Sequence, residues 1–372
     1  MSLLVPSTGT RRPTFHSLEV VDVERLTDAA VAITFAVPDD LAGQYRRFEA
    51  GQHVTLRADL GHGEVRQSYS IAMSPTRARE TATLRVGSAH VPGGRMSTWL
   101  NTVVAVGDRI DVMTPTGGFH SPVRPRESRR HVAIAAGSGI TPVLAIVTDI
   151  LEREPLSAVT LLYGNRDTRS IMFLEDLEDL KDAHPERFQL VHVLSREPRE
   201  SELLSGRLDP NRISALLAAF APVADVDEFY LCGPQGMVEG AQSLLAMAGV
   251  ATDRVHHEVF HVASQEGRAA HVVIDEGAPA EAVVTVRLDG RRTRIEMPTR
   301  AESILDATLR QRPDAPYSCT GGVCGTCRAR VVSGEVSMDR NYALEADEIA
   351  RGIVLACQAH PVSDEVELDY DE

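Results

Sequence analysis

The stretch HVAIAAGSGITPVLAI, at residues 131–146, decides the fold of the central part of this chain. It predicts an apolar strand over residues 131–136, a glycine-rich turn, and a helix from Thr141. The turn is Gly137-Ser138-Gly139-Ile140-Thr141-Pro142, and its proline falls in the first helical turn, where the missing N–H costs nothing. Such a turn offers free N–H groups and the positive end of a helix dipole to a dinucleotide pyrophosphate. The pattern is G-x-G-x-x-P rather than G-x-G-x-x-G, so a plain tight turn of an α/β protein is the alternative.

Strands and helices continue to alternate from this stretch to about residue 262. Further strands are expected at 158–163, 189–194, 228–232 and 256–260, and further helices at 173–183, 213–220 and 235–248. Apolar strands separated by helices predict a parallel, doubly wound sheet, in which ligands collect at the carboxyl ends of the strands. We therefore assign residues 125–262 to a nucleotide-binding α/β domain.

Two strand ends of this domain carry residues that suit a nucleotide. Ser195 and Arg196 follow an expected strand at the point where the adenosine ribose would lie. A hydroxyl beside a guanidinium suits a ribose 2′-phosphate, which favours NADPH over NADH. The alternative is a solvated arginine, because the same loop also holds Glu197 and Arg199. Cys232-Gly233-Pro234 ends another strand at this edge, although a lone strand cysteine is more often inert core.

The chain before residue 125 has a different texture. Short apolar and β-branched runs, separated by glycine and proline turns, lie at residues 30–36, 53–58, 82–88 and 109–114. They show little helical periodicity, which predicts an antiparallel β-barrel over residues 1–124.

The charge and the start of the chain narrow its partners and its location. Among the 372 residues, 38 basic side chains stand against 53 acidic ones, and the net charge of -15 argues against a nucleic-acid binder, which needs clustered cations. The start MSLLVPSTGT has no charged segment followed by an apolar one, so we expect a cytoplasmic protein without a secretory signal. The apolar residues 132–151 are interrupted by Gly137, Gly139 and Pro142, so we expect strand, turn and helix there and no membrane span.

After residue 262 the sequence changes again. Residues 263–280 are small, polar and charged without a sustained period, which predicts a linker. Apolar runs at 283–288 and 293–297 flank Asp289-Gly290, a strong hairpin signal, and a helix is expected at 303–311. We assign residues 281–372 to a third domain.

Four of the five cysteines lie in this third domain: Cys319, Cys324, Cys327 and Cys357. The spacing C-x4-C-x2-C with a distant fourth cysteine is the plant-type ferredoxin arrangement for a 2Fe-2S cluster. Thiolates are soft ligands for iron, and Gly321, Gly322 and Gly325 allow backbone N–H groups to approach the cluster sulfurs. A zinc ion bound by four thiolates is the alternative, although zinc sites usually show two C-x2-C pairs and only one is present here.

The order of barrel, dinucleotide sheet and plant-type ferredoxin resembles the ferredoxin-NADP reductase superfamily, in its form with a C-terminal ferredoxin domain. The stretches that carry the resemblance are GQHVTL, AIAAGSGITPVLAI, LLYGNR, LCGP, ESILDATLRQ and GGVCGTC. Within that superfamily, nearly the whole chain is similar to the reductase subunits of phenylacetyl-CoA epoxidases.

This resemblance implies a fold and a function. The implied fold is an antiparallel β-barrel that binds FAD, a doubly wound α/β domain that binds NADPH, and a β-grasp α+β ferredoxin domain. The implied enzyme is an NADPH-dependent oxidoreductase that passes electrons to FAD, to the 2Fe-2S cluster and then to a diiron oxygenase component with an acyl-CoA substrate, in phenylacetate catabolism. A reductase for another aromatic-ring or steroid oxygenase is the alternative within this class. A zinc-bearing, nucleotide-binding protein without enzymatic activity is the alternative from a different class.

The resemblance also assigns residues to the flavin. The family motif Arg-x-Tyr-Ser falls on Gln67-Ser68-Tyr69-Ser70, so Tyr69 would stack on the flavin ring and Ser70 would approach its N5. Gln67 replaces the motif arginine, and Arg66 is expected to point to the opposite face of the strand from Gln67. The second element, VPGGRMSTWL, would face the FAD pyrophosphate with backbone N–H groups and one hydroxyl, from Gly93, Gly94, Met96 and Ser97.

Around the nicotinamide, Cys232 and Glu258 match family positions and join Ser70 as the expected catalytic residues. Phe260 matches an aromatic residue that covers the flavin, and a core aromatic at the end of the last strand is the alternative. The other nucleotide contacts are expected at four strand ends: Gly137, Ser138, Gly139, Thr141 and Pro142; Asn165 and Arg166; Ser195 and Arg196; Cys232, Gly233 and Pro234. The four cysteines of the third domain would bind iron.

The oxygenase component is expected to dock at the ferredoxin domain. Acidic residues gather before the fourth cysteine, at Glu345, Asp347 and Glu348, and again over residues 364–372. An acidic surface near the cluster would steer the domain toward a basic patch on the partner. The alternative is a solvated face without a specific partner.

Overall fold

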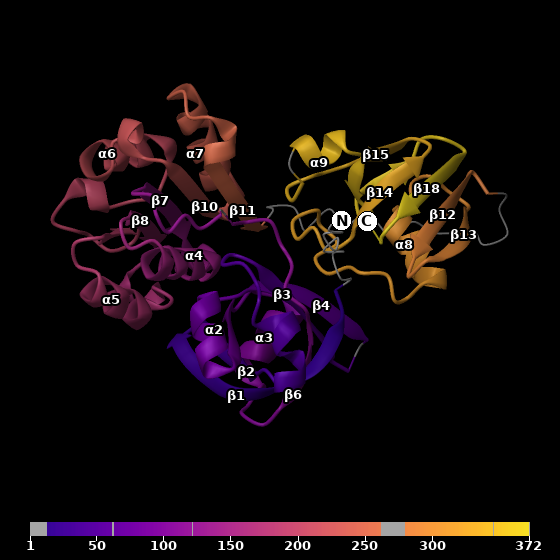
Figure 1. Ribbon diagram of the computed structural model, residues 1–372, viewed down its shortest axis with the longest axis horizontal. Coiled ribbons are helices and arrows are strands. Elements are labelled where there is room, and N and C mark those ends of the chain that lie inside the picture. Colours follow the sequence, from indigo (N-terminus) through magenta and orange to yellow (C-terminus); the bar gives the residue numbers. More distant parts are fainter. Residues whose placement is uncertain (1–12, 62, 121, 262–279, 345, 372) are drawn as a thin grey trace, which may run out of the picture. The chain divides into compact units, whose positions relative to one another are not determined.

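The computed structural model describes residues 13–61, 63–120, 122–261, 280–344 and 346–371. The described residues form two compact units, one within residues 16–261 and the other within residues 280–371. The first unit contains an antiparallel sheet followed by a parallel sheet, and the second contains a mixed sheet (Figure 1). Within the described ranges, no helix is long and apolar enough to cross a membrane.

A six-stranded sheet forms the N-terminal half of the first unit. Its strands are β1 (Phe15–Thr27), β2 (Ala30–Ala36), β3 (His53–Asp59), β4 (Glu64–Ser70), β5 (Thr83–Ala89) and β6 (Arg109–Met113), with short helices α1 (Ala42–Tyr45), α2 (Pro75–Thr81) and α3 (Arg95–Thr102). The strand order is β4-β3-β6-β1-β2-β5, and an antiparallel bridge between Ile71 and Val86 joins the two outer strands. The sheet thereby closes around a core that includes the fully buried Leu18, Phe35 and Leu56. An antiparallel sheet closed on itself has no free edge.

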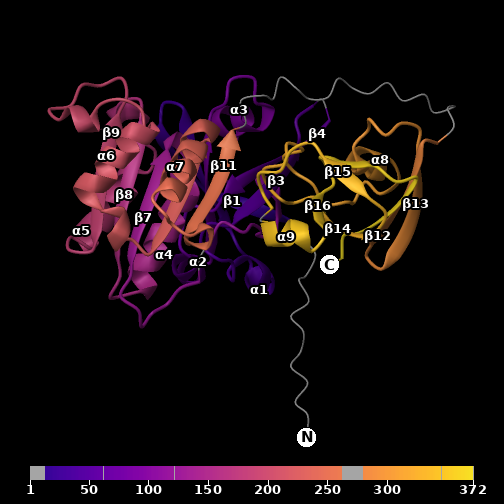
Figure 2. The same cartoon turned by 90° about the horizontal axis from the view of Figure 1, so that it is seen from above.

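The second half of the first unit is a five-stranded parallel sheet with helices on both faces (Figure 2). Its strands are β7 (Arg130–Ala136), β8 (Ala158–Asn165), β9 (Phe188–Leu194), β10 (Glu228–Pro234) and β11 (Val255–His261), and its helices are α4 (Ile140–Arg153), α5 (Leu174–Ala183), α6 (Pro210–Phe220) and α7 (Gln235–Met247). Residues of α4 and α5 share one apolar core, and residues of α6 and α7 share another. The order β11-β10-β7-β8-β9 reverses direction between β7 and β10. Ligands of such sheets bind at this reversal, outside the carboxyl ends of the strands.

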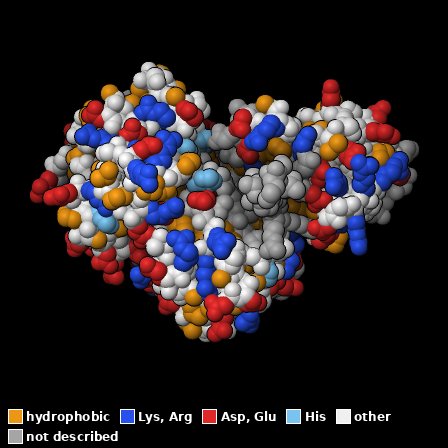
Figure 3. Space-filling view, viewed as in Figure 1, with side chains coloured by type: hydrophobic (Ala, Val, Ile, Leu, Met, Phe, Trp, Pro, Cys, Tyr) orange, Lys and Arg blue, Asp and Glu red, His pale blue; other side chains and the backbone are white. Residues whose placement is uncertain are grey.

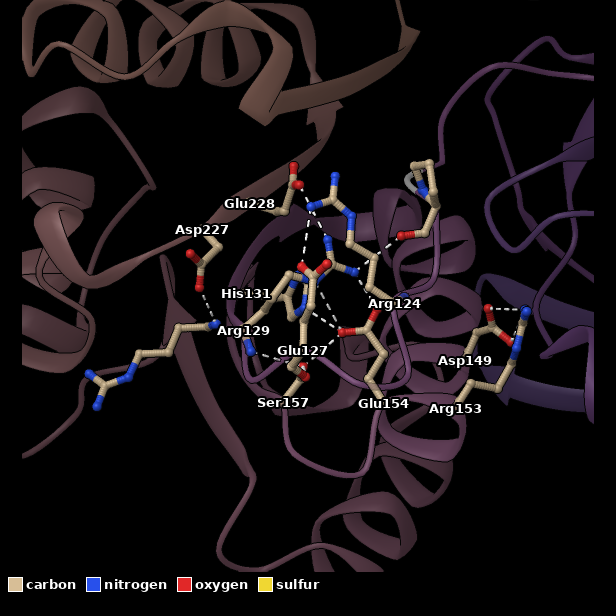
Figure 4. Close-up of polar contacts among 12 residues, drawn as sticks. Arg124, Glu127, Arg129, His131, Asp149, Arg153, Glu154, Ser157, Asp227 and Glu228 are labelled. Carbon is tan, nitrogen blue, oxygen red and sulfur yellow. Dashed lines mark hydrogen bonds and ion pairs between the residues drawn. The ribbon is translucent and has the colours of Figure 1, made fainter.

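A buried ion cluster lies where the chain enters the parallel sheet (Figure 4). Glu154, just after α4, is fully buried and accepts hydrogen bonds from Arg129 and, at 2.7 Å, from Ser157 Oγ. His131 Nε2 lies 3.2 Å from the same carboxylate, and Arg129 also reaches Glu228 at 3.3 Å. Burial alone would raise the pKa of Glu154, but its hydrogen bonds, above all with His131 and Arg129, outweigh burial and lower the pKa to about 2. The cluster joins the start of β7 to the end of α4 and the start of β10.

The second unit contains a five-stranded sheet of order β13-β12-β18-β14-β16 and a two-stranded sheet of β15 and β17. The elements are β12 (Ala282–Leu288), β13 (Arg291–Met297), α8 (Ile304–Gln311), β14 (Arg328–Ser333), β15 (Val336–Met338), α9 (Ala346–Ala350), β16 (Ile353–Leu355), β17 (Ala359–Pro361) and β18 (Glu365–Asp369). Strands β12 and β18 run parallel, while β13 and β14 pair antiparallel to their neighbours. Helix α8 begins where Ser303 Oγ accepts from the Asp306 backbone N–H at 3.1 Å, and it buries Ile304 and Leu305 against the sheet.

The predicted fold class is confirmed, because an antiparallel sheet, a parallel sheet and a mixed C-terminal sheet follow one another along the chain. The hairpin predicted at Asp289-Gly290 forms between β12 and β13, and both residues have positive φ, 53° and 69°. Strand β5 begins one residue later than expected, because Ala82 adopts the left-handed conformation at the end of α2. The linker predicted at 263–280 lies outside the described residues except for Ala280, and the domain boundaries stay predictions.

Candidate functional site

Three residues that the sequence analysis placed at the reaction centre come together at the carboxyl edge of the parallel sheet. Ser70, the last residue of β4, donates from its hydroxyl to Glu258 Oε2 at 3.3 Å. Glu258 pairs in register with Cys232 across strands β11 and β10. The Cys232 thiol is fully buried, and burial, reinforced by the Glu258 carboxylate, raises its pKa well above the usual value. The barrel and the dinucleotide sheet thus make a polar contact at this point, with a protonated thiol beside a carboxylate.

His53 is a member of this site that the sequence analysis missed. It lies opposite Ser70 in the β3–β4 register, it is buried, and its Nδ1 is 3.8 Å from Glu258 Oε1. Its Nε2 lies 3.3 Å from the hydroxyl of Thr116. The signal in the sequence was a polar residue inside the apolar strand of the GQHVTL stretch. Two barrel residues therefore lie at the Glu258 carboxylate, Ser70 within hydrogen-bonding distance of one oxygen and His53 near the other.

The glycine turn after β7 has the geometry that a dinucleotide needs. Gly137 has φ +55° and open space where a Cβ would lie, whereas a Cβ on Gly139 would stand 2.3 Å from the carbonyl oxygen of Cys232. Only glycine at 139 lets this turn approach β10 so closely. The Thr141 hydroxyl donates to the Ser138 carbonyl at 2.8 Å, inside the first turn of α4 that also contains the buried Pro142. The hydroxyl of Thr141 therefore stabilises the turn, and the backbone of the turn is left to face a ligand.

The ends of β8 and β9 run side by side. The Ser195 backbone N–H donates to the Asn165 carbonyl at 2.9 Å, and the Arg196 N–H donates to the Arg166 carbonyl at 2.7 Å. Both arginines are exposed, and neither has an acidic partner among the described residues. Glu197, next in sequence, is turned away, because both its carboxylate oxygens accept from Thr168, at 2.8 and 2.9 Å. Two exposed arginines at neighbouring strand ends, without an ion pair to a carboxylate in the described chain, are candidates for binding a phosphate.

The loop before α3 combines a tight turn with a helix start. Gly93 has φ +77° with open space around its Cβ position, and Gly94 is the N-cap residue of α3. The Ser97 hydroxyl accepts from the Val91 N–H at 3.1 Å and donates to the Gly94 carbonyl at 3.2 Å, so it fixes the loop. Met96 is buried in the barrel core. The open cradle at Gly93 and the first N–H groups of α3 fit a pyrophosphate.

The remaining flavin candidates lie along β4 and β11. Tyr69 is nearly buried and packs in the barrel core with its hydroxyl beside that of Ser88. Alternation along β4 puts Arg66 and Ser68 on the face opposite Tyr69, and Arg66 Nε pairs with Glu64 at 2.7 Å. Phe260 is partly buried against the core shared by α4 and α5, which leaves both interpretations of this residue open.

The four cysteines of the second unit interact as two pairs. Cys319 and Cys324 lie close enough to influence each other's ionisation, and so do Cys327 and Cys357. This contact raises the pKa of Cys319 and, together with burial, that of Cys327, whereas it lowers the pKa of Cys357. No three described His, Cys, Asp or Glu side chains are spaced for a single metal ion. Two pairs of thiols are the arrangement that two iron atoms, each bound by two cysteines, require.

The backbone of the cysteine loop supports the same interpretation. The Gly321 N–H points at Cys319 Sγ at 3.4 Å, and a backbone N–H of Gly322 reaches the Cys357 sulfur. Gly322 and Gly325 have φ of +78° and +66°, so the loop needs glycine at both positions. The hydroxyl of Thr326, in the same loop, is buried and has no hydrogen bond within the described part of the chain. The chain therefore fits a cluster whose sulfur atoms accept hydrogen bonds.

Comparison with known proteins identifies the domains that contain these candidate sites. Residues 17–121 match the model of an oxidoreductase FAD-binding domain, residues 133–243 that of an oxidoreductase NAD-binding domain, and residues 286–362 that of a 2Fe-2S iron-sulfur cluster binding domain. The fold resembles that of phthalate dioxygenase reductase, with a TM-score of 0.59, 22% identity, and coverage of 95% of this chain and 98% of that one. Fold and sites together define an NAD(P)H-dependent flavin and iron–sulfur oxidoreductase.

Two groups of relatives narrow this class. The chain is 42% identical over 96% of its length, and 98% of the relative's, to a subunit of the 1,2-phenylacetyl-CoA epoxidase of Escherichia coli. It is 37% identical over 95% of its length, and 96% of the relative's, to the ferredoxin reductase component of 3-ketosteroid-9-alpha-monooxygenase of Mycobacterium tuberculosis. The chain belongs to this family of oxygenase reductase components.

Proposed function

We propose that this chain oxidises NADPH in the cytoplasm and delivers electrons to a diiron oxygenase whose substrate is phenylacetyl-CoA or a similar acyl-CoA thioester. The observation that carries the proposal is the contact of Ser70, from the barrel, with Glu258, at the edge where a dinucleotide binds. The 42% identical relative supports the choice of oxygenase. When bound, FAD supplies hydride acceptance and the 2Fe-2S cluster supplies one-electron transfer.

The residues around Glu258 have distinct tasks in this proposal. Ser70 donates to one oxygen of the Glu258 carboxylate and His53 lies near the other, so the two residues would orient the Glu258 side chain. Cys232 is fully buried and its raised pKa keeps the thiol protonated, so it adds no second negative charge beside Glu258. These groups would orient two rings for direct transfer, which requires no acid–base residue.

Arg166 and Arg196 would hold the 2′-phosphate of NADPH, with Ser195 beside them. Their backbones are hydrogen-bonded to each other, so both side chains start from neighbouring positions, and neither forms an ion pair with a carboxylate of the described chain. The glycine turn at 137–139 would face the pyrophosphate of the same dinucleotide. Cys319, Cys324, Cys327 and Cys357 would bind the iron atoms in two pairs.

The oxygenase would dock on the ferredoxin unit near the cysteine loop. Glu348 pairs at 2.6 Å with Arg328, the residue that directly follows Cys327. Asp347 pairs with Arg351 at 3.0 Å. Glu345 lies outside the described residues. Acidic and basic side chains stand next to each other over this unit (Figure 3). Since arginines offset part of the acidic charge, steering by this surface would be modest.

Reconstitution tests the proposal. The purified chain is mixed with an epoxidase of the phenylacetyl-CoA type, and NADPH consumption and thioester product are measured. Product formed in proportion to NADPH supports the proposal. A steroid 9α-hydroxylating oxygenase serves as the second partner, because a 37% identical relative carries that name. Turnover with the steroid system alone would contradict the choice of oxygenase.

A further inference from the structure

Gln358 directly follows the fourth cysteine, and its side chain reaches back to the first part of the cysteine loop. Its Nε2 donates to the Thr320 carbonyl at 3.0 Å and to the Cys357 carbonyl at 2.9 Å, and it lies 3.7 Å from Cys357 Sγ. Both oxygens are carbonyl acceptors, so only the NH₂ group of the amide can face them. The orientation of the amide is therefore determined by its neighbours.

The stem of the same side chain packs against a strained part of the loop. Thr320 has φ +51°, which is unusual for a residue other than glycine. A Cβ on Gly322 would lie 3.2 Å from Gln358 Cγ, so the stem lies directly over this glycine. The hydrogen bond to Thr320 spans 38 residues and joins the segment of the first cysteine to that of the last. Such a bond stabilises a backbone conformation that the local sequence disfavours.

We propose that Gln358 is a positioning residue that closes the cluster-binding loop and shares one side-chain N–H between the carbonyl and the ligand sulfur of Cys357. This inference rests on the proposed binding of a 2Fe-2S cluster by the four cysteines. A donor beside a thiolate stabilises the more negative, reduced form, so the amide raises the reduction potential. The link to Thr320 also slows opening of the loop and loss of iron.

The test uses the full chain in three variants: Gln358→Leu, Gln358→Glu and Gln358→Asn. Leucine keeps the bulk without a donor, and glutamate keeps the shape but puts oxygen where the NH₂ lies. Asparagine keeps the amide on a shorter stem. Gln311→Glu, on the exposed end of α8, is the matched charge control.

Two measurements decide the inference. In redox titrations followed by absorbance and electron paramagnetic resonance, we expect Gln358→Leu to lower the cluster potential, Gln358→Glu to lower it further, and Gln311→Glu to leave it unchanged. Iron release to a ferrous chelator should be several-fold faster in Gln358→Leu and Gln358→Glu. If one of these variants folds but assembles no cluster, that result also supports a role of Gln358 in closing the cysteine loop. The reduction potential of the cluster is then measured in Gln358→Asn.

A parental potential and parental iron release in both Gln358→Leu and Gln358→Glu would overturn the inference. Reduction of FAD by NADPH, in the other unit, should not change in any variant. Absence of iron from the parent protein would instead contradict the proposed cluster, so the two failures are distinguishable.

Discussion

Ser70 and Glu258 are 188 positions apart in the chain, and the hydroxyl of the first donates to the carboxylate of the second at 3.3 Å. The bond joins the last residue of a barrel strand to the last strand of the parallel sheet. Neither sheet alone contains the site, because each contributes one side of the contact.

We expect Glu258→Gln and Ser70→Ala to slow the reduction of FAD by NADPH by roughly 10- to 100-fold, or about 1.4 to 2.7 kcal/mol of activation free energy. The reason is that each variant loses a contact that would orient the flavin and nicotinamide rings, while the residues that would bind the dinucleotide are unchanged. Stopped-flow absorbance of the flavin measures the rate. Glu239→Gln, on the exposed face of α7, is the control. Parental rates in both variants would show that the contact is only structural.

Arg196→Ala should narrow the preference for NADPH over NADH by about tenfold to a hundredfold, because a charge-assisted bond contributes on the order of 1.5 to 3 kcal/mol. Kinetics with NADH should barely change. Arg199→Ala, on the same loop, is the matched control, and steady-state kcat/KM with each dinucleotide is the measurement. Equal losses with both dinucleotides would assign Arg196 a structural role.

Cys324→Ser should remove the cluster or make it labile, because a hydroxyl is a hard, weakly acidic ligand for iron. Reduction of a two-electron acceptor through FAD should persist, since the cysteines and the dinucleotide sheet belong to different units. Iron content and NADPH-dependent dye reduction measure the two effects. Loss of both in a folded variant would contradict separate electron-transfer steps.

Glu154→Gln should destabilise the protein by about 3 kcal/mol at pH 7, because the buried Arg129 and His131 lose the charged carboxylate between them and Arg129 keeps only its longer ion pair with Glu228 among the described residues. The folded pKa of Glu154, about 2, lies below its ordinary 4.5. Its contribution is therefore present above about pH 4.5 and is lost as pH falls toward 2.

The difference between parent and variant in the free energy of unfolding should accordingly shrink as pH falls below 4.5. Urea unfolding at stepped pH values measures it. Glu152 is exposed near the end of α4, and Glu152→Gln should change the free energy of unfolding by no more than about 0.5 kcal/mol. A difference in unfolding free energy that does not depend on pH would mean that the charge of Glu154 is not what stabilises the buried ion cluster around Arg129.

Electron transfer to the oxygenase should slow as salt rises, because the screening length falls from about 10 Å at 0.1 M to about 3 Å at 1 M. Replacing Glu345, Asp347 and Glu348 by their amides should lower the association rate and flatten this salt dependence. The same change at three acidic residues of α5, Glu175, Glu178 and Asp179, is the control. Identical association rates and salt dependences in the parent and the triple variant would show that Glu345, Asp347 and Glu348 form a solvated face without a role in docking.

The sequence could predict the order of the three domains and most of the local chemistry. Apolar strands, glycine turns and cysteine spacing are local signals, because they arise from the backbone and ligand needs of a few neighbouring residues. The turn at 137–139 and the pattern of Cys319, Cys324 and Cys327 belong to this category. Glu258 came from a resemblance, since one acidic residue in a strand has no local signal of function.

Only the tertiary structure decided which side chains meet. His53 was missed because its partner carboxylate comes from β11, and the register that sets Cys232 beside Glu258 exists only once β10 and β11 pair. The acidic residues near the fourth cysteine looked like one charged surface in sequence. Folding pairs Glu348 with Arg328, 20 positions earlier in the chain, which offsets its charge. The physical reason is common to all three cases: sequence patterns fix local backbone geometry, whereas side-chain contacts across strands and loops depend on packing between distant segments.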